Sequence, residues 1–217
     1  MKITSVECVI LDKQFPFVLV HTDEGLLGIG ECFRRQPGIT KTVIDEILAP
    51  SIIGKDPCET DARFRDMSKA GSALEIGGAI WIGIAGLDIA MWDLKGKSLG
   101  MPIYKLLGGK VRDKVPVYAS SLKRGMTPVE EAKRAEFFVD QGYRAYKLHS
   151  AVPGKIDDPS DQTIATVSEV RKAVGDDIDI LVDVNGAYSV HHSIEIGKQL
   201  ESLGVFHFEE PRPHYDL

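Results

Sequence analysis

The stretch Asp179-Ile180-Leu181-Val182-Asp183-Val184-Asn185-Gly186 decides how the rest of the chain is interpreted. Its apolar, largely β-branched centre indicates a buried strand, and Gly186 ends the run. Alternate side chains of a strand share a face, so we expect Asp183 and Asn185 to point in the same direction. An acid at the carboxyl end of a hydrophobic parallel strand is typical of the places where α/β proteins build their sites.

Polar side chains also end the two neighbouring apolar segments. The segment before this stretch ends in Lys147-Leu148-His149, which puts Lys147 and His149 on one face of a strand. The segment after it ends in Glu209-Glu210, and strand alternation places these two acids on opposite faces. Three consecutive strands therefore end in Lys/His, Asp/Asn and Glu, which is in outline the set that a metal ion and a base require.

Composition limits the class of protein. The chain has 217 residues, of which 43% are hydrophobic and 27% charged, as expected of a soluble globular protein with one large domain or two modest ones. The net charge of −6 argues against a surface for nucleic acid. No apolar run reaches the roughly 18 residues of a membrane helix. The first dozen residues carry acids and no cleavage signature, so we expect no signal peptide and no membrane partner.

The cysteines indicate the compartment. Cys8, Cys32 and Cys58 are odd in number and widely spaced, which fits a reducing cytoplasm better than a disulfide framework. They also lack the paired spacing of a zinc site. We therefore expect a cytoplasmic protein.

The first half of the chain predicts a small mixed domain. Residues 1–33 alternate like an antiparallel meander, with Asp23-Glu24-Gly25 as a hairpin turn. Helical patterns follow, and the third is apolar nearly all round in its first half, which predicts a buried helix. The three expected helices are Thr40–Leu48, ended by Pro50, then Cys58–Met67 and Ala79–Lys97.

The second half predicts alternating strands and helices. A turn-rich segment, residues 99–112, separates it from the first, so we place two domains at 1–112 and 113–217. Strands separated by helices of this length favour parallel pairing. The expected strands are Val115–Ser120, Ala145–His149, Ile178–Val184 and Val205–Glu209. The expected helices are Thr127–Gln141, Gln162–Val174 and Val190–Leu203. Thr127, Pro128 and Glu130 form the start of the first of these helices.

Four such strands make half of a (β/α)8 barrel, and a half barrel leaves two parallel edges open. The sequence stops at Leu217, just after the fourth strand. Either the sheet is an open one or, as we expect, the chain is a piece of something longer.

Several motifs in this order resemble the mandelate racemase/muconate lactonizing enzyme branch of the enolase superfamily. The resemblance covers nearly the whole chain and is strongest in the segment Ala85–Lys97. The other matching pieces are Met1–Glu7, Gly25–Glu31, Met101–Gly109, Val182-Asp183-Val184-Asn185 and Glu209-Glu210-Pro211 followed by Asp216. The resemblance implies an α+β capping domain on a modified (β/α)8 TIM-type barrel, of which residues 113–217 would form the first four strands.

The resemblance also implies a magnesium ion at the mouth of the barrel. Asp183 and Glu209 would be its first two carboxylate ligands, and Glu210 would be an outward neighbour. The spacing puts a third ligand near position 235, beyond this chain. Hard oxygen ligands suit magnesium, and a divalent cation takes up the charge that develops when an α-proton leaves a carboxylate.

The second strand departs from the pattern of the mandelate racemase-like enzymes. They carry Lys-x-Lys, whereas this chain carries Lys147-Leu148-His149. By resemblance, Lys147 would lie near the substrate carboxylate and lower the pKa of its neighbour, and His149 would occupy the position of the base. Asn185 would contact the substrate, and His207 would pack beside Glu209. Phe15, Phe17 and the loop 33–38 fall where the family's cap covers the substrate.

The implied reaction is abstraction of the α-proton of a carboxylate through an enediolate, most simply the dehydration of a sugar acid, an aldonate or aldarate. Three alternatives stay open at this point: a racemase, epimerase or cycloisomerase of the same superfamily, a catalytically inactive truncated fragment, and an unrelated doubly wound sheet, against which the N-terminal meander argues. At full length the family resemblance implies a homo-oligomer acting on a small carboxylate.

Overall fold

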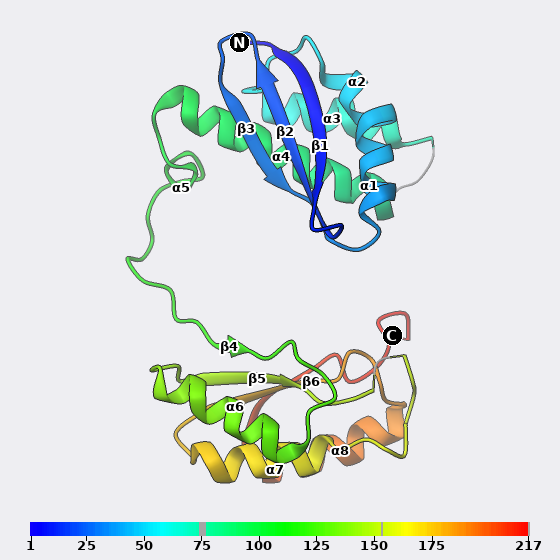
Figure 1. Ribbon diagram of the computed structural model, residues 1–217, viewed down its shortest axis with the longest axis vertical. Helices are drawn as coiled ribbons and strands as arrows, with labels where there is room; N and C mark the ends of the chain where they lie inside the picture. Colours follow the sequence, from blue (N-terminus) through cyan, green and yellow to red (C-terminus); the bar gives the residue numbers. More distant parts are fainter. Residues whose placement is uncertain (74–76, 153, 217) are drawn as a thin grey trace. The chain divides into compact units, whose positions relative to one another are not determined.

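The computed structural model describes residues 1–73, 77–152 and 154–216, and the chain divides into two compact units (Figure 1). The N-terminal unit is Met1–Asp113 and the C-terminal unit is Lys114–Leu217. This division falls one residue after the domain boundary that the sequence suggests.

A three-stranded antiparallel sheet forms one layer of the N-terminal unit. Its order β1-β2-β3 follows the sequence, with strands β1 (Ile3–Leu11), β2 (Phe15–Thr22) and β3 (Leu27–Glu31). Buried and less buried residues alternate along β2, because one face of the sheet covers the core. The meander and the turn at residues 23–25 are confirmed.

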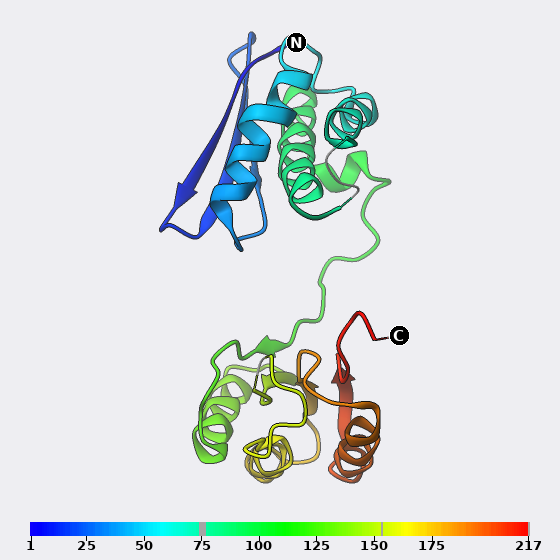
Figure 2. The same ribbon diagram turned by 90° about the vertical axis from the view of Figure 1, so that its right-hand side faces the viewer.

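Helices cover one face of this sheet (Figure 2). Helix α1 (Pro37–Val43) runs directly into the π-helix η1 (Ile44–Leu48) and then into α2 (Ala49–Ile52). The prediction that this helix ends at Pro50 is wrong: Pro50 lies in the first turn of α2, where a missing N–H is tolerated. The remaining helices are α3 (Thr60–Gly71), α4 (Gly78–Leu99) and α5 (Ile103–Leu106).

Strand β3 packs unusually close to helix α4. A Cβ added to Gly30 would lie 2.0 Å from the carbonyl oxygen of Gly86, so only glycine permits this approach. The apolar sequence of helix α4 predicts that the helix is buried on all sides. In the described chain this prediction is wrong, because Trp81 and Ile89 are 40% and 49% exposed.

The C-terminal unit holds a four-stranded parallel sheet in the order β4-β5-β6-β7. Its strands are β4 (Ala119–Ser120), β5 (Ala145–His149), β6 (Asp179–Asp183) and β7 (Val205–Glu209). The predicted parallel sheet is confirmed, but its first strand is much shorter than Val115–Ser120. Pairing begins only at Ala119, and Pro116, within the predicted strand, has no N–H for a ladder hydrogen bond.

Three helices lie on one face of this sheet (Figures 1 and 2). Helix α6 (Pro128–Asp140) begins at the predicted capping box, in which Thr127 and Glu130 bond to each other's backbone, and α7 (Thr163–Val174) and α8 (Val190–Ser202) follow. The core between sheet and helices contains Tyr146, Leu148, Ile180 and Val182. Strand alternation therefore turns Lys147, His149 and Asp183 to the other face.

In the part of the chain that the structure describes, no helix is both long and apolar enough to cross a membrane.

Candidate active site

Strand register brings the predicted site residues side by side. In the parallel sheet His149 pairs with Asp183, and Asp183 pairs with Glu209. All three lie at the carboxyl ends of their strands, where parallel sheets gather functional side chains. The convergence inferred from the sequence is therefore present in the structure.

Lys147 lies between the two predicted metal ligands. Its Nζ is 3.1 Å from Asp183 Oδ2 and 2.7 Å from Glu209 Oε2. Burial by itself lowers the pKa of the Lys147 ammonium, but hydrogen bonds to Glu209 and Asp183, together with the charges of these carboxylates, outweigh burial and raise that pKa above its ordinary value. Lys147 therefore stays protonated as the counter-charge of both acids.

One ring nitrogen of His149 forms a hydrogen bond, and the other lies close to an acid. Nδ1 lies 2.6 Å from the backbone oxygen of Ser121, and Nε2 lies 3.1 Å from Asp183 Oδ2. A carbonyl oxygen only accepts, so Nδ1 is the donor in the first contact. This contact fixes the orientation of the ring and leaves Nε2 as the nitrogen that faces the site.

Asn185 ends β6 in an unusual conformation. Its φ is +46°, in the left-handed region, which asparagine tolerates better than most residues. There its backbone N–H and its Nδ2 both donate to Asp183 Oδ1, at 2.9 and 2.6 Å. Asn185 thus orients the Asp183 carboxylate, and its Oδ1 accepts from Arg124 Nη2.

One acid and one histidine near β7 differ from the predictions. Glu210 has a φ of +45°, which takes it out of strand alternation, and its Oε2 accepts from Asn185 Nδ2 at 3.3 Å. It is thus linked to the network rather than turned away from it. His207 is half-exposed, with Nε2 3.9 Å from Glu209 Oε2, so it contacts that carboxylate instead of packing in a core.

The segment after β4 contributes to the site, although none of its residues was among the predicted site residues. Ser121 supplies the carbonyl that holds His149, and Arg124 contacts Asn185. The rule that selected the other strand ends applies here too, since the polar residues Ser121, Lys123 and Arg124 follow a predicted strand. No acid or histidine marks this segment, so its pattern is less conspicuous.

The donor set fits a divalent cation in part. Asp183 and Glu209 offer carboxylate oxygens from paired strands, the kind of ligand that Mg²⁺ prefers, and the Lys147 ammonium already places a positive charge between them. Within the described ranges, however, no cluster of three or more His, Cys, Asp or Glu side chains has the geometry of a metal site. The expected third ligand near position 235 stays a prediction.

Comparison with known families matches both units. Residues 4–108 match the family described as the mandelate racemase/muconate lactonizing enzyme N-terminal domain, and residues 129–217 match the enolase C-terminal domain-like family. With an antiparallel capping unit and a parallel sheet whose strand ends carry acids and bases, the chain has the features of an enolase-type protein. It belongs to the mandelate racemase/muconate lactonizing enzyme family of the enolase superfamily.

Among characterised relatives, the chain is 35% identical over 216 residues to the D-galactonate dehydratase of Verminephrobacter eiseniae (strain EF01-2), which covers 97% of this chain and 55% of that protein. It is 33% identical over 204 residues to the D-gluconate dehydratase of Thermoproteus tenax, covering 92% and 41%. The chain therefore spans about half the length of the relatives it matches.

A solved structure agrees with this assignment. The mandelate racemase/muconate lactonizing protein from Paracoccus denitrificans Pd1222 superposes with a TM-score of 0.90 and 32% identity, covering 99% of this chain and 60% of that one. A mandelate racemase/muconate lactonizing protein from Paracoccus denitrificans PD1222 complexed with magnesium gives a TM-score of 0.87 at 32% identity and covers the same shares. The expected family and the partial TIM-type barrel are confirmed.

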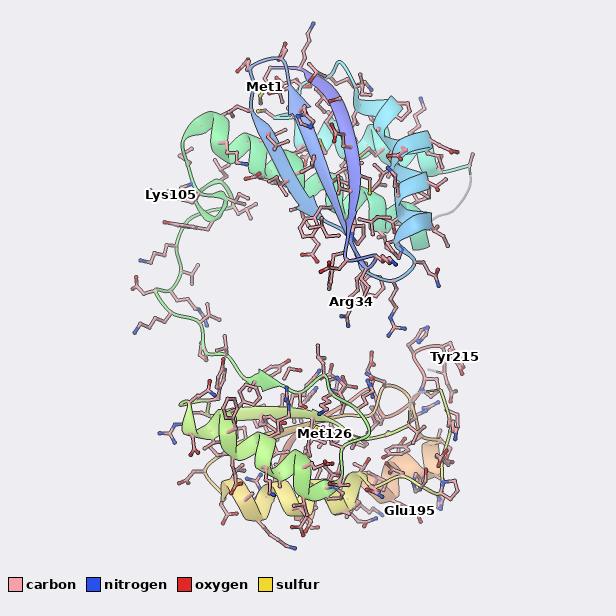
Figure 3. The ribbon with its side chains drawn as sticks, viewed as in Figure 1. Met1, Arg34, Lys105, Met126, Glu195 and Tyr215 are labelled. Carbon is pink, nitrogen blue, oxygen red and sulfur yellow. The ribbon has the colours of Figure 1, made fainter. Side chains whose placement is uncertain are left out.

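The predicted substrate-covering residues lie in the N-terminal unit. Phe15 and Phe17 belong to β2, and the predicted loop 33–38 is a loop only as far as Gln36, because Pro37 and Gly38 begin α1. Figure 3 labels Arg34, which lies in this loop. The role of these residues in substrate selection stays a prediction.

Proposed function

We propose that this chain is the N-terminal part of a magnesium-dependent sugar-acid dehydratase, a hydro-lyase acting on an aldonate or aldarate. The observation that carries the proposal is the convergence of Lys147, His149, Asp183 and Glu209 from three adjacent strand ends. The dehydratase activities of the Verminephrobacter and Thermoproteus relatives support the class of substrate.

His149 is the proposed base. Its Nδ1–H is committed to the Ser121 carbonyl, so Nε2 is the nitrogen that removes the proton from the α-carbon. The electron pair left at the α-carbon then expels the β-hydroxyl, and the protonated imidazole can return its proton to the departing hydroxide to form water. The resulting enol rearranges to a 2-keto-3-deoxy acid, so atoms and charge balance without an oxidant.

Lys147 and the acids set the electrostatics. Lys147 holds a buried positive charge, which favours a substrate carboxylate over a neutral group. Asp183 and Glu209 would hold the divalent cation, with Asn185 orienting Asp183. When bound, that cation would supply positive charge to offset the negative charge developing on the substrate carboxylate.

The test is solvent deuterium exchange into a panel of aldonates and aldarates, by the protein at the full length its gene encodes and with Mg²⁺ present. Dehydration gives a 2-keto-3-deoxy acid, whereas a racemase or epimerase gives α-deuterated acid of both configurations. Absence of both products with every acid would contradict the proposal.

Residues 1–217 on their own are expected to show no turnover. The described residues supply two carboxylates for the cation, and strand β7 leaves one edge of the sheet unpaired. Turnover by the purified 217-residue chain, in a preparation shown by mass spectrometry to hold no longer form, would overturn this expectation.

A further inference from the structure

A cavity of about 480 Å³ lies beside the candidate site within the C-terminal unit. The segment between β4 and α6, the loop after β5 and the start of α7 enclose it, and Figure 3 labels Met126 in the first of these segments. Its volume is in the range of pockets that bind small molecules.

His149 belongs both to this cavity and to the cluster of site residues. Its Nε2 lies 3.1 Å from Asp183 Oδ2, and His149 is also one of the residues that line the cavity. A substrate whose α-carbon lies against Nε2 therefore has the cavity within reach of the carbons further along its chain. The proposed mechanism uses none of the other lining side chains.

The lining suits hydroxyl groups. Threonine, serine and glutamine side chains supply donors and acceptors, at Thr127, Ser150, Ser160, Gln162 and Thr166. Each can exchange hydrogen bonds with a sugar hydroxyl, as sites for polar small molecules require.

The two charged side chains that line the cavity, Arg124 and Glu131, have different partners. Arg124 donates to Asn185. Glu131 is only 4% exposed, and its Oε1 accepts a 2.6 Å hydrogen bond from the Tyr146 hydroxyl. Across residues 1–73, 77–152 and 154–216, no lysine, arginine or histidine nitrogen forms an ion pair with the Glu131 carboxylate. A second carboxylate entering the cavity would therefore meet a buried negative charge without a cation against it.

We propose that this cavity receives the neutral polyhydroxy tail of a sugar acid, and that Glu131 selects aldonates over aldarates by repelling a distal carboxylate. Hydroxyl groups gain an acceptor in Glu131 and a donor in Arg124, whereas a carboxylate gains repulsion from the former. This inference rests on the proposed function and narrows its substrate class to acids with one carboxylate.

Glu131→Gln is the sharpest test, because the amide keeps the shape of the side chain and an acceptor for the Tyr146 hydroxyl but removes the charge. The measurement is kcat/KM of the full-length protein for a six-carbon aldonate and for the aldarate of the same configuration. The wild type should favour the aldonate at least about tenfold, and Glu131→Gln should reduce that ratio about tenfold. Glu136→Gln, an exposed charge on the same helix, should leave the ratio as it is.

A second pair of variants tests the tail contacts. Arg124→Gln and Thr166→Val should lower kcat/KM more for the six-carbon aldonate than for 2,3-dihydroxypropanoate, which has no tail to place in the cavity. Lys123→Gln removes a neighbouring exposed charge that does not line the cavity and should not change this preference.

The two proposals fail in different ways. A wild type that turns over sugar acids with an aldonate-to-aldarate ratio insensitive to Glu131→Gln overturns the cavity assignment and leaves the dehydratase intact. A wild type that turns over no acid contradicts the dehydratase. Equilibrium dialysis of the same two acids against wild type and Glu131→Gln then decides about the cavity, and equal selectivity of the two proteins overturns it.

Discussion

The two units bury different kinds of side chains. Within the described part of the N-terminal unit, Arg63 is the buried charged residue, and its guanidinium donates to the Asp56 carbonyl and pairs with Glu59 and Asp66. The described part of the C-terminal unit buries three charged residues, namely Glu131, Lys147 and Asp183. Two of these three charges lie together at the carboxyl ends of β5 and β6.

This difference separates packing from chemistry. Burying charge costs free energy even when it is paired, and replacing such pairs by apolar residues often stabilises a protein. The buried charges at the strand ends therefore lower the stability of the C-terminal unit. In the N-terminal unit, close backbone contact between β3 and α4 fixes how the helix packs on the sheet. Substitutions in the two units should accordingly affect different measured quantities.

The largest expected effect is on activity. His149→Ala should lower kcat for dehydration by about 10³-fold, the size of a lost general base, with a small change in the unfolding free energy. Steady-state kinetics and thermal unfolding of the full-length protein measure both. His207→Ala is the matched control, since His207 is half-exposed and only approaches Glu209. Equal losses in the two variants would contradict the role of His149.

The next largest effect is on the N-terminal unit. Gly30→Ala puts a Cβ 2.0 Å from the Gly86 carbonyl oxygen, so β3 and α4 must separate, at a cost of about 3 kcal/mol in the unfolding free energy. Urea denaturation measures this. Gly38→Ala is the control: its Cβ meets no atom within 4 Å, and alanine should stabilise α1 by up to about 1 kcal/mol. If Gly30→Ala unfolds like wild type, the close contact does not limit stability.

A smaller effect is expected when the counter-charge is removed. Without added metal, Lys147→Met should lower the unfolding free energy by about 2 kcal/mol, because Asp183 is left buried without its cation, and Mg²⁺ should restore part of the loss. Chemical denaturation with and without Mg²⁺ measures both, and Lys172→Met, in an exposed pair, should change little.

The same variant has a defined pH dependence. The folded-state pKa of Lys147 is raised above 10.5, so its stabilising contribution is present below the ordinary lysine pKa and is lost as pH rises through the raised value. The difference between wild type and Lys147→Met should therefore be constant at neutral pH and shrink in strong alkali. A difference that grows with pH would contradict the assignment.

The smallest effect concerns the start of α6. Thr127→Ala removes the side chain that accepts from the Glu130 N–H and should cost about 1 kcal/mol in thermal unfolding. Lys133→Ala, an exposed substitution within the same helix, should stay within about 0.5 kcal/mol of wild type. If the two variants unfold alike, the capping box does not stabilise this unit.

Local patterns explain why much of the fold could be predicted. The bounds of β7 agree with its apolar run and its two terminal acids, and the start of α6 agrees with the capping box at Thr127. Both features depend on a few neighbouring residues. Pro116 accounts for one missing position of β4 but not for Val117 and Tyr118. The exposed side of α4 could not be foreseen, because an apolar sequence does not show which face lacks a neighbour.

The site could be predicted only as far as strand alternation reaches. Alternation and spacing placed Lys147, His149 and Asp183 together, and the register bears this out. The contact of Glu210 with Asn185 could not be predicted, because the positive φ of Glu210 ends the strand alternation. The cavity beside His149 could not be predicted either, because residues from three separate segments line it. How these segments come together depends on tertiary packing and not on any local sequence pattern.

Asn185 joins a backbone requirement to a chemical one. Glycine would accept the same left-handed turn but would remove the side-chain donor, and aspartate would keep the turn but bring a third negative charge against Asp183 and Glu210. A longer amide would keep the donor and resist the turn. Few single substitutions are therefore tolerated at this position. A different residue here in a related protein would indicate that the carboxylate equivalent to Asp183 has a different function.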